Sequence, residues 1–354
     1  PTTPTMSRWC SNQLSYAPKV GAHSSGEGFS KQPARADLFH LNATGGAEAM
    51  TAPPDAHTIL RMYRRQRPDD PAHTHTMNPS LQDSISRNVR AALDEDIGGG
   101  DLTALLIPAT AQARARVISR EDAVLCGTAW FDACFIALDV STRIDWSARD
   151  GDRVSAGQSL CEISGPARAL LSAERPALNF LQTLSGVASE TRRHVEAIAG
   201  TRARIYDTRK TLPGLRIAQK YAVKCGGGEN QRIGLHDGIL IKENHIAAAG
   251  GIRPALEAAF ALAAGKISVQ IEVESLEQLD AALAGGAKLI LLDNFDLAGM
   301  RAAVALAGGR AQLEASGGIT LDNVRAIAET GVDRISIGGL TKNVRALDLS
   351  MRLL

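Results

Sequence analysis

The sequence predicts an α/β fold, with an incomplete, open α/β barrel preceded by an α+β sandwich domain. Three observations lead to this prediction. After residue 200, short apolar runs typical of buried strands alternate with segments of helical periodicity. Glycine is abundant (33 residues) and aromatic residues make up only 4% of the chain, as suits a fold built from small side chains. Six strands of this kind are clear, whereas a closed barrel has about eight, so we expect an open one.

Length and composition indicate a cytoplasmic enzyme of about two domains. The chain has 354 residues, of which 44% are hydrophobic and 22% charged. Its formal net charge of +1 gives no overall field that attracts nucleic acid or an anionic membrane. No apolar run reaches about 18 residues, and the five cysteines form no Cys-x-x-Cys pair. We therefore expect no nucleic-acid or membrane partner, no disulfide framework and no zinc site.

Residues 1–78 differ in composition from the rest. They contain eight of the fourteen prolines and five of the eight histidines, with almost no apolar periodicity. Such a segment buries too little apolar surface to offset the entropy lost on ordering. We interpret it as a disordered or non-native extension, with Met77 as a candidate start, and exclude it from the site.

Residues 79–184 are predicted to form the N-terminal sandwich domain. A helix over about 83–94 is followed by β-rich stretches at 113–118 and 153–163. The second stretch resembles part of a swinging-arm carrier domain, but no lysine that could carry biotin or lipoate lies nearby. We therefore interpret it as a scaffold hairpin.

A long helix is predicted from Ser172 to about Ala199. Pro176 suits the first helical position, and the residue before a proline avoids helical geometry. We therefore expect Arg175 to lie at an exposed helix mouth. The second domain, over 185–354, is predicted to begin within this helix.

The barrel domain is predicted from its alternating strands and helices. Parallel strands joined by helical crossovers place their carboxyl ends at one mouth, where such barrels hold their active sites. The predicted strands are 203–206, 239–241, 267–273, 289–292, 312–315 and 334–337, and the predicted helices are 253–264, 276–284, 297–307 and 321–330.

Each predicted strand ends in polar or glycine residues, which we expect to converge at that mouth. The first strand ends in a basic string and the third in two glutamates, Glu272 and Glu274, while the fifth and sixth end in glycine pairs. Candidate site residues at these ends are Thr208, Arg209, Lys210, Lys242, Glu274, Asp293, Ser316, Gly317, Gly318, Ile337 and Gly338.

The candidate mouth is rich in groups that bind anions. Residues 202–242 contain nine Lys/Arg and three Asp/Glu. The planar fork of arginine suits carboxylates, so Arg175, Arg209 and Arg232 indicate a ligand that carries several of them. Glycine pairs, and a helix beginning near residue 321, favour phosphate binding by backbone N–H groups.

Glu274 and Asp293 suit a shared Mg²⁺ whose other ligands are substrate phosphates. The residues alone leave other interpretations open. The two acids can be an acid/base pair or salt-bridge partners of Lys210 and Lys242. The basic cluster can be a solvated face or an RNA patch, which predicts a non-enzymatic polyanion-binding protein. Lys242 follows an apolar run, where burial can make it the nucleophile of a Schiff-base lyase.

Specific strings in the sequence resemble the quinolinate phosphoribosyltransferase family, also called nicotinate-nucleotide diphosphorylase (carboxylating). The resemblance covers about residues 93–354 and not the first 78. The strings include Glu174-Arg-Pro-Ala-Leu-Asn, Asp207-Thr-Arg-Lys-Thr-Leu-Pro-Gly, Gly226-Gly-Gly-Glu-Asn-Gln-Arg, Leu240-Ile-Lys-Glu-Asn-His, Ile271-Glu-Val-Glu, Leu291-Leu-Asp-Asn-Phe and Ser316-Gly-Gly-Ile.

The resemblance implies an activity and a set of roles. Quinolinate and 5-phosphoribosyl 1-diphosphate would react with Mg²⁺ to give nicotinate mononucleotide, diphosphate and CO2, in NAD biosynthesis. A homodimer would complete each site with Arg175 from the partner. Arg209, Arg232 and Lys242 would hold the carboxylates of quinolinate. Lys210, Glu274 and Asp293 would be catalytic and handle the ribosyl diphosphate, with Glu274 and Asp293 on the metal, and Thr208, Ser316, Gly317, Gly318, Ile337 and Gly338 would complete substrate binding.

One position departs from the family pattern. The usual Gly-Gly-Gly-x-Asn-His-Arg string has Gln231 in place of its histidine. Glutamine can donate a hydrogen bond but cannot become cationic. Gln231 is therefore expected to bind substrate without a proton-linked role.

We predict that deleting residues 1–76 leaves turnover within about twofold of the full chain, because a segment with so little apolar surface contributes no core. Steady-state kinetics and thermal unfolding of the two proteins test this. A collapse of the unfolding temperature on deletion would show that the segment is part of the folded domain.

Overall fold

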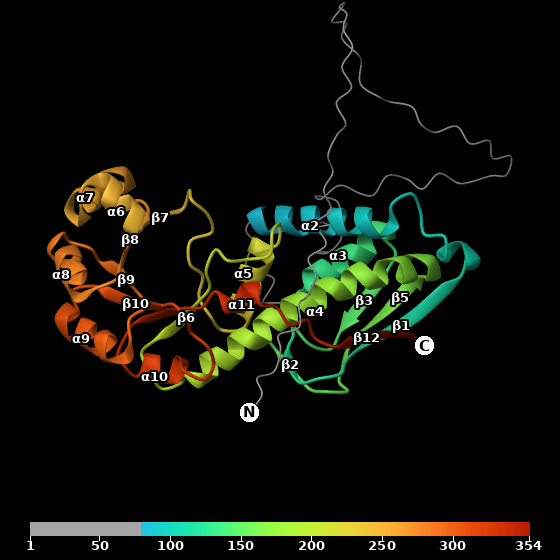
Figure 1. Cartoon of the computed structure of the whole chain (residues 1–354). Helices are drawn as coiled ribbons and strands as arrows, with labels where there is room; N and C mark the ends of the chain where they lie inside the picture. The colour runs from blue at the N-terminus through green and yellow to red at the C-terminus, as the bar shows by residue number, and fades with distance from the viewer. Residues whose placement is uncertain (1–78) are drawn as a thin grey trace, which may run out of the picture. The chain divides into compact units, whose positions relative to one another are not determined.

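The computed structural model describes residues 79–354 (Figure 1). Our predictions for residues 1–78 lie outside this range. The described chain has a mixed α/β fold with one antiparallel sheet of four strands, one parallel sheet of six and a two-stranded ribbon. The predicted class, an open α/β barrel preceded by an α+β sandwich, is confirmed.

The sandwich consists of three helices on the antiparallel sheet, whose strand order is β12-β1-β5-β3. Its core is aromatic: Trp130, Phe131 and Phe135 are each 0% exposed. The elements are α2 (Pro79–Ile97), α3 (Thr128–Leu138), α4 (Ala167–Ala197), β1 (Gln112–Ser119), β3 (Arg143–Trp146), β5 (Ser159–Pro166) and β12 (Leu349–Leu353), with the short η1 (Ala104–Leu106), β2 (Ala123–Val124) and β4 (Arg153–Val154) beside them.

Strand β1 shows how the sequence pattern sets the two faces of this sheet. Ala115 and Val117 are fully buried, whereas Arg114 and Arg116 lie on the outer face. Both arginines pair with Glu162 on the neighbouring β5, at 2.7 and 2.6 Å. Alternation with a period of two therefore places the apolar residues on the helices and a small ion-pair network on the outer face.

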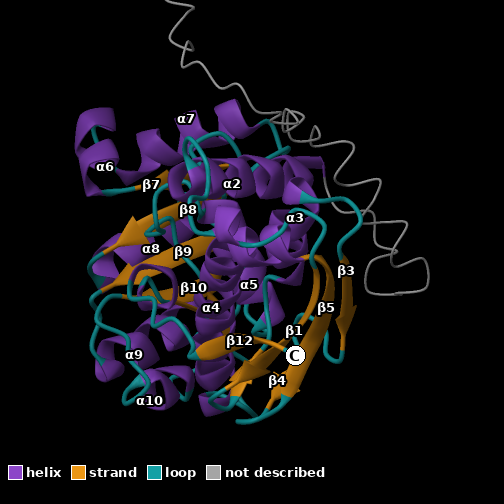
Figure 2. Ribbon diagram, turned by 90° about the vertical axis from the view of Figure 1, so that its right-hand side faces the viewer, coloured by secondary structure: helices purple, strands orange, loops and turns teal. Residues whose placement is uncertain are grey.

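The parallel sheet has the order β6-β11-β10-β9-β8-β7, with helices packed along it (Figure 2). All six predicted strands and the helices α7, α8 and α9 are confirmed. The strands are β6 (Arg204–Tyr206), β7 (Gly238–Ile241), β8 (Ser268–Val273), β9 (Leu289–Asp293), β10 (Gln312–Ser316) and β11 (Arg334–Ser336), and the helices are α5 (Arg216–Cys225), α6 (Glu243–Ala249), α7 (Ile252–Ala263), α8 (Leu276–Ala284), α9 (Leu297–Ala307), α10 (Val324–Ala328) and α11 (Gly339–Lys342).

The barrel is open between β6 and β7. These strands follow one another along the chain, but they are the two edges of the sheet and do not pair. The segment between α5 and β7 runs along the free edge of β6, where Glu229 forms a parallel bridge with Tyr206. An irregular segment therefore covers part of the edge that a further strand would occupy in a closed barrel.

Helix α4 differs from the prediction at its start. It begins at Ala167 rather than Ser172, so Pro176 lies inside the helix and Arg175 is not at a helix mouth. The proline lacks an N–H, which costs about 3 kcal/mol inside a helix. Burial of Leu170, Ala173 and Ala177, each 0% exposed, provides the packing that holds the helix together across this position.

The predicted scaffold hairpin over 153–163 is wrong. Strand β4 pairs with β2, and β5 pairs with β1 and β3. Helices α3 and α5 and strands β3 and β12 were not predicted. Ten consecutive residues of α3 are buried, so the helix has no polar face and no period to detect.

The C-terminal segment returns to the sandwich. Strand β12 pairs antiparallel with β1, in a register that matches Val117 with Met351. Leu347 and Leu349 are buried in the sandwich core, together with Ala218 and Ala222 of α5. The cores of the sandwich and the barrel therefore interleave along the sequence, and a division at 184/185 stays a prediction.

In the part of the chain that the structure describes, we find no single helix with the length and apolar composition needed to cross a bilayer; only α6 and α7 taken together, bent by 96°, meet that criterion. Leu256 and Ala259 of α7 are buried in the barrel core. The cytoplasmic location stays a prediction.

We predict that Gly186→Ala destabilises the fold by about 1–3 kcal/mol, the usual cost of an overpacked position. A methyl group at Gly186 on α4 would lie 2.2 Å from the backbone oxygen of Arg345, where the C-terminal segment crosses the helix. Alanine favours a helix by about 1 kcal/mol, so the clash opposes the propensity gain. Urea denaturation measures the change, with Arg193→Ala on the exposed face of the same helix as the control. Equal stability of Gly186→Ala and the unmodified protein would contradict this packing.

Candidate active site

A cavity of about 530 Å³ lies at the carboxyl ends of the barrel strands. Strands β9 and β10 align there in register, Asp293 opposite Ser316, so both reach the mouth at the same level. Ten predicted site residues line the cavity: Thr208, Arg209, Lys210, Gln231, Arg232, Lys242, Asp293, Ser316, Gly317 and Gly318. Residues at four strand ends and on the segment crossing the open side therefore converge as expected.

The positive charge of segment 202–242 divides into paired and unpaired groups. Outside the cavity, Arg202 pairs with Asp333, Arg204 and Lys224 with Glu229, and Lys220 with Asp207. Within residues 79–354, no ion pair engages the cavity cations Arg209, Lys210 and Arg232, whereas Lys242 pairs with Glu272 at 2.7 Å. Among the described residues, the cations of this segment without an ion pair are Arg209, Lys210, Arg216 and Arg232, and all but Arg216 line the cavity.

Arg232 shows the electrostatic character of the cavity. Burial lowers the pKa of its guanidinium, and the positive charge of Arg209 lowers it further. Arg232 also donates to the carbonyl of Gly238, 2.9 Å away, which fixes the direction of its side chain. Two guanidinium groups that repel one another favour an anion between or beside them, since the anion relieves the repulsion and adds charge-assisted hydrogen bonds.

A buried carboxylate forms the floor of the cavity. Glu314 is 0% exposed and accepts from Gln231 at 2.5 Å and Gln270 at 3.1 Å, and it forms an ion pair with Arg334 at 3.0 Å. Burial raises the pKa of this carboxyl group, and the hydrogen bonds and the charge of Arg334 lower it in part. The amide donor of Gln231 is therefore committed to the floor.

The glycine turn after β10 is shaped for close backbone approach. Gly317 and Gly318 have φ of 99° and 59°. A methyl group on Gly317 would lie 2.1 Å from Oδ1 of Asn294, so no larger residue fits there. A methyl group on Gly338 would meet Cδ of Lys210 at 2.9 Å, which places the second glycine turn against that lysine. Gly317 and Gly318 line the cavity, and a glycine turn of this kind can present backbone N–H groups to an anion.

The helix expected from about residue 321 is shorter than predicted. Helix α10 covers only Val324–Ala328, and turns occupy residues 321–323. Asn323 is engaged in this turn, accepting from Thr320 N–H and donating to the carbonyl of Gly318. The hydrogen bonds of the Asn323 side chain thus compete with regular helix at residues 321–323. The structure therefore does not support our expectation that a helix beginning near residue 321 helps to bind an anion.

The two candidate glutamates after β8 have different positions. Glu272 lines the cavity, is 8% exposed and pairs with Lys242, whereas Glu274 is exposed and does not line it. The backbone N–H of Glu274 donates to Gln278 at the start of α8. The structure therefore favours Glu272 over Glu274 as the site glutamate.

Asp293 has the donor atoms that a hard cation needs. Asn294 donates to its Oδ2 at 2.9 Å, and its other oxygen has no protein donor among the described residues. Asp293 and Glu272 both line the cavity. One or two carboxylates with room for phosphate oxygens and water fit the preference of Mg²⁺.

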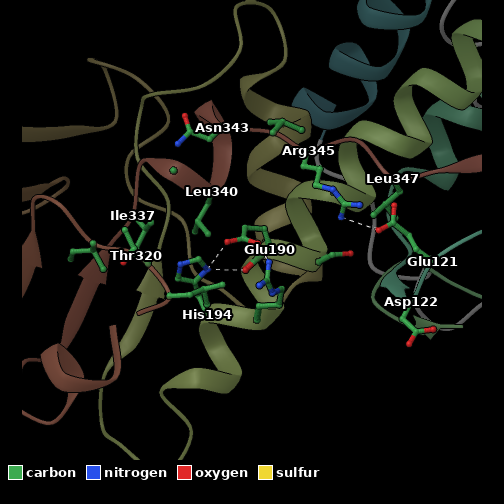
Figure 3. A pocket seen from close by; sticks show the side chains of 17 residues that line it. Glu121, Asp122, Glu190, His194, Thr320, Ile337, Leu340, Asn343, Arg345 and Leu347 are labelled. Carbon is green, nitrogen blue, oxygen red and sulfur yellow. Dashed lines mark hydrogen bonds and ion pairs between the residues drawn. The ribbon is translucent and has the colours of Figure 1, made fainter. Parts of the chain in front are cut away.

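Besides Glu274, three predicted residues lie outside this lining. Arg175 is on α4 with 58% of its side chain exposed, and its nearest acid is Glu174 at 4.0 Å. Gly338 lies next to Lys210 as described above, and Ile337 lines a second cavity of about 550 Å³ (Figure 3). In that second cavity, Glu190 and the buried His194 contact one another, and Arg345 pairs with Glu121.

The sequence analysis missed several lining residues, namely Leu240, Gln270, Leu291, Asn294, Glu314 and Ser336. A signal for some of them was available. Gln270 and Glu272 alternate with the apolar residues Val269, Ile271 and Val273 along β8, so both face the same side of the strand. Polar residues at that spacing on a buried strand indicate a cavity.

Comparisons with known proteins identify one family for both domains. The N-terminal and C-terminal domain models of quinolinate phosphoribosyl transferase match residues 101–185 and 187–352. A Bacillus subtilis protein named probable nicotinate-nucleotide pyrophosphorylase [carboxylating] is 43% identical over 257 residues, which cover 73% of this chain and 89% of the relative.

Two further relatives give the same result. The nicotinate-nucleotide pyrophosphorylase [carboxylating] of Mycobacterium leprae is 44% identical over 281 residues, covering 77% of this chain and 98% of the relative. The solved structure of the nicotinate-nucleotide pyrophosphorylase from Francisella tularensis has a TM-score of 0.75 at 44% identity, covering 77% of this chain and 96% of that one.

Proposed function

The chain belongs to the quinolinate phosphoribosyltransferase family, and we propose that it transfers phosphoribosyl from 5-phosphoribosyl 1-diphosphate to quinolinate with loss of CO2. The products are nicotinate mononucleotide and diphosphate, and the reaction serves NAD biosynthesis. The observation that carries this function is the cluster of Arg209, Lys210 and Arg232 in one cavity, opposite carboxylates and a glycine turn.

We assign the dicarboxylate to the end of the cavity that holds Arg209, Arg232 and Lys242. Guanidinium forks bind carboxylates in a fixed plane, so two of them set the orientation of the pyridine ring. The ring nitrogen can then face the anomeric carbon of the ribose. With the nucleophile supplied by the substrate, the protein contributes alignment and charge rather than a reactive side chain.

The ribosyl diphosphate is assigned to the glycine turns and Lys210. Backbone N–H groups of residues 316–318 and 338 suit the 5-phosphate, and Lys210 beside Gly338 adds a positive charge. As the bond to diphosphate breaks, negative charge grows on the leaving oxygens. A cation about 4 Å away contributes roughly 4 kcal/mol at an effective dielectric of about 20, before desolvation.

Decarboxylation follows from the product of the first step. Once ribosylated, the ring nitrogen is cationic and stabilises the electron pair that stays on the adjacent ring carbon when its carboxylate departs as CO2. A proton from solvent then takes the place of the carboxylate on that carbon. The dicarboxylate end must therefore hold one carboxylate and release the other.

We propose Mg²⁺ as the cofactor, held by Asp293 and Glu272. A bound Mg²⁺ would neutralise the diphosphate of the substrate. No described residue donates a hydrogen bond to Oδ1 of Asp293, and Glu272, which lines the same cavity, pairs with Lys242 at 2.7 Å. The metal role predicted for Glu274 passes to Glu272 on this geometry.

We propose a homodimer in which Arg175 serves the partner's site. Arg175 is exposed and lies one turn from Ser172, which donates to Asp101 at 2.7 Å. Beyond Asp101, the side chains of Leu102, Leu105 and Leu106 are 63–81% exposed. An apolar patch next to an arginine without a strong ion-pair partner is typical of an interface between subunits.

The structure opposes a Schiff-base lyase. Lys242 is 45% exposed and its ammonium pairs with Glu272 at 2.7 Å. A nucleophilic lysine needs burial without a carboxylate partner, and Lys242 meets neither condition.

A product assay tests the function. Quinolinate, nicotinate or neither is supplied with 5-phosphoribosyl 1-diphosphate and Mg²⁺, and nucleotide, diphosphate and CO2 are quantified. We expect equal amounts of the three products from quinolinate and no CO2 from nicotinate. Absence of nucleotide from quinolinate, with folded protein, would overturn the proposal.

Complementation tests the shared site. We predict that Arg175→Ala and Lys242→Ala each lower kcat/KM by at least about 100-fold, in the range for loss of one charged site group. If each site takes Lys242 from one subunit and Arg175 from the other, a dimer of the two variants has one site with both residues intact and one site that lacks both. Mixing under conditions that exchange subunits should restore measurable activity, and a mixture as inactive as its components would refute the shared site.

Carboxylate variants test the metal assignment. We predict that Asp293→Asn and Glu272→Gln lower kcat/KM for the ribosyl diphosphate by about 100-fold or more, as for other lost transition-state contacts. Glu274→Gln is the matched control, with an expected change below about threefold because the carboxylate is exposed outside the cavity. As a second readout, calorimetry measures the Kd for Mg²⁺ of each variant in the presence of the diphosphate substrate. If activity and Mg²⁺ binding were lost in Glu274→Gln but not in Glu272→Gln, the assignment would be reversed.

A further inference from the structure

The segment that crosses the open side of the barrel carries two residues of the dicarboxylate end. Gln231 and Arg232 both line the cavity, yet they belong to no strand or helix. Backbone pairing with β6 ends at Glu229, whose N–H donates to Ile205 and whose carbonyl accepts from Asp207. Something other than a sheet ladder must therefore fix the backbone of residues 230–232.

A buried ion pair holds that backbone. Asp207 follows β6 and Lys220 lies on α5; their side chains are 0% and 3% exposed and their charged atoms are 2.5 Å apart. Oδ1 of Asp207 accepts the backbone N–H of Gln231 at 2.8 Å. Nζ of Lys220 donates to the backbone carbonyl of Gln231 at 2.9 Å. Both polar groups of one residue's backbone are thus bound by the two members of one ion pair.

The neighbouring contacts extend this arrangement. With its amide oriented to satisfy its partners, Asn230 donates to Oδ2 of Asp207 at 2.7 Å and to the carbonyl of Lys220 at 3.0 Å. The Gln231 side chain is tied to Glu314, and Arg232 donates to Gly238 at the start of β7. The segment is therefore attached to both edges of the open barrel and to its floor.

We propose that Asp207 and Lys220 are positioning residues, which clamp the backbone of Gln231 and thereby hold Arg232 in place for the dicarboxylate. This inference rests on the proposed function. A buried ion pair by itself is a poor source of stability, because desolvation offsets the attraction. Here the pair also satisfies the partly buried backbone N–H and carbonyl of Gln231, and it ties their position to the first strand of the barrel.

The clamp acts on one substrate and not on the other. The groups assigned to the ribosyl diphosphate and its metal are Lys210, Glu272, Asp293, residues 316–318 and Gly338. None of them makes a hydrogen bond or ion pair with the side chain of Asp207 or Lys220 within residues 79–354. Loosening the clamp should therefore weaken quinolinate binding selectively. If the pair had a purely structural role, its loss would weaken the binding of both substrates or of neither.

The experiment uses Lys220→Met, which keeps the length of the side chain and removes its charge and donors. We expect the Kd for quinolinate to rise at least about tenfold, while the Kd for 5-phosphoribosyl 1-diphosphate with Mg²⁺ changes less than about twofold; tenfold corresponds to loss of one sizeable polar contact. Asp207→Asn together with Lys220→Met removes both charges and avoids an unpaired buried ion, and it should show the same selective loss. Lys220→Arg should recover part of the affinity.

The matched control is Lys224→Met on the same helix. Lys224 forms an exposed pair with Glu229, and such surface pairs contribute little, so both Kd values should stay within about twofold. Unchanged quinolinate binding in Lys220→Met, or an equal loss for both substrates, would overturn the clamp.

Hydrogen exchange separates failure of the clamp from failure of the proposed function. In the unliganded protein, the Gln231 amide should exchange at least about tenfold faster in Lys220→Met than in the unmodified chain or in Lys224→Met, because local opening exposes it. Faster exchange in a protein that does not bind quinolinate would leave the clamp standing and remove the proposed function. Unchanged exchange would remove the clamp alone.

Discussion

Repulsion between cations held close together at one end of a parallel sheet is the constraint on which the rest of the site depends. Burial lowers the pKa of Arg232, and the positive charge of Arg209 lowers it further, so the two guanidinium groups oppose one another. A flexible chain would separate such groups into water. The scaffold must keep them together, and their mutual repulsion becomes affinity for an anion once one arrives.

Two kinds of support keep the cations in place. The strands supply rigid attachment for the residues at their ends, because Asp293, Ser316 and Lys242 directly follow or end buried strands. No strand pairs with Gln231 and Arg232 at the open side of the barrel. There the buried side chains of Asp207 and Lys220 hold the backbone in place of hydrogen bonds between strands. Glu314 under the cavity shows the same device, a carboxylate whose burial is offset by several donors.

Much of the barrel could be predicted from the sequence, because its strands are short apolar runs between helices of clear period. The site residues at strand ends followed from the geometry of parallel sheets. Three features could not be predicted in this way. The start of α4 depends on tertiary packing that overrides Pro176, and α3 is buried on all sides and has no period. The two glutamates are only two residues apart, so the choice between them depends on where β8 ends relative to the cavity. This end point could not be predicted from the sequence.

The most direct measurement is calorimetric binding of quinolinate and of nicotinate to the same protein over a range of salt concentrations. A cavity that holds several unpaired cations should bind the dicarboxylate at least about tenfold more tightly than the monocarboxylate, since a second charge-assisted contact contributes roughly 1.5–3 kcal/mol. The preference should shrink in Arg209→Met and in Arg232→Met, and should fall with rising salt concentration because Arg209 is exposed. Equal affinities for the two acids in the unmodified protein would contradict the account.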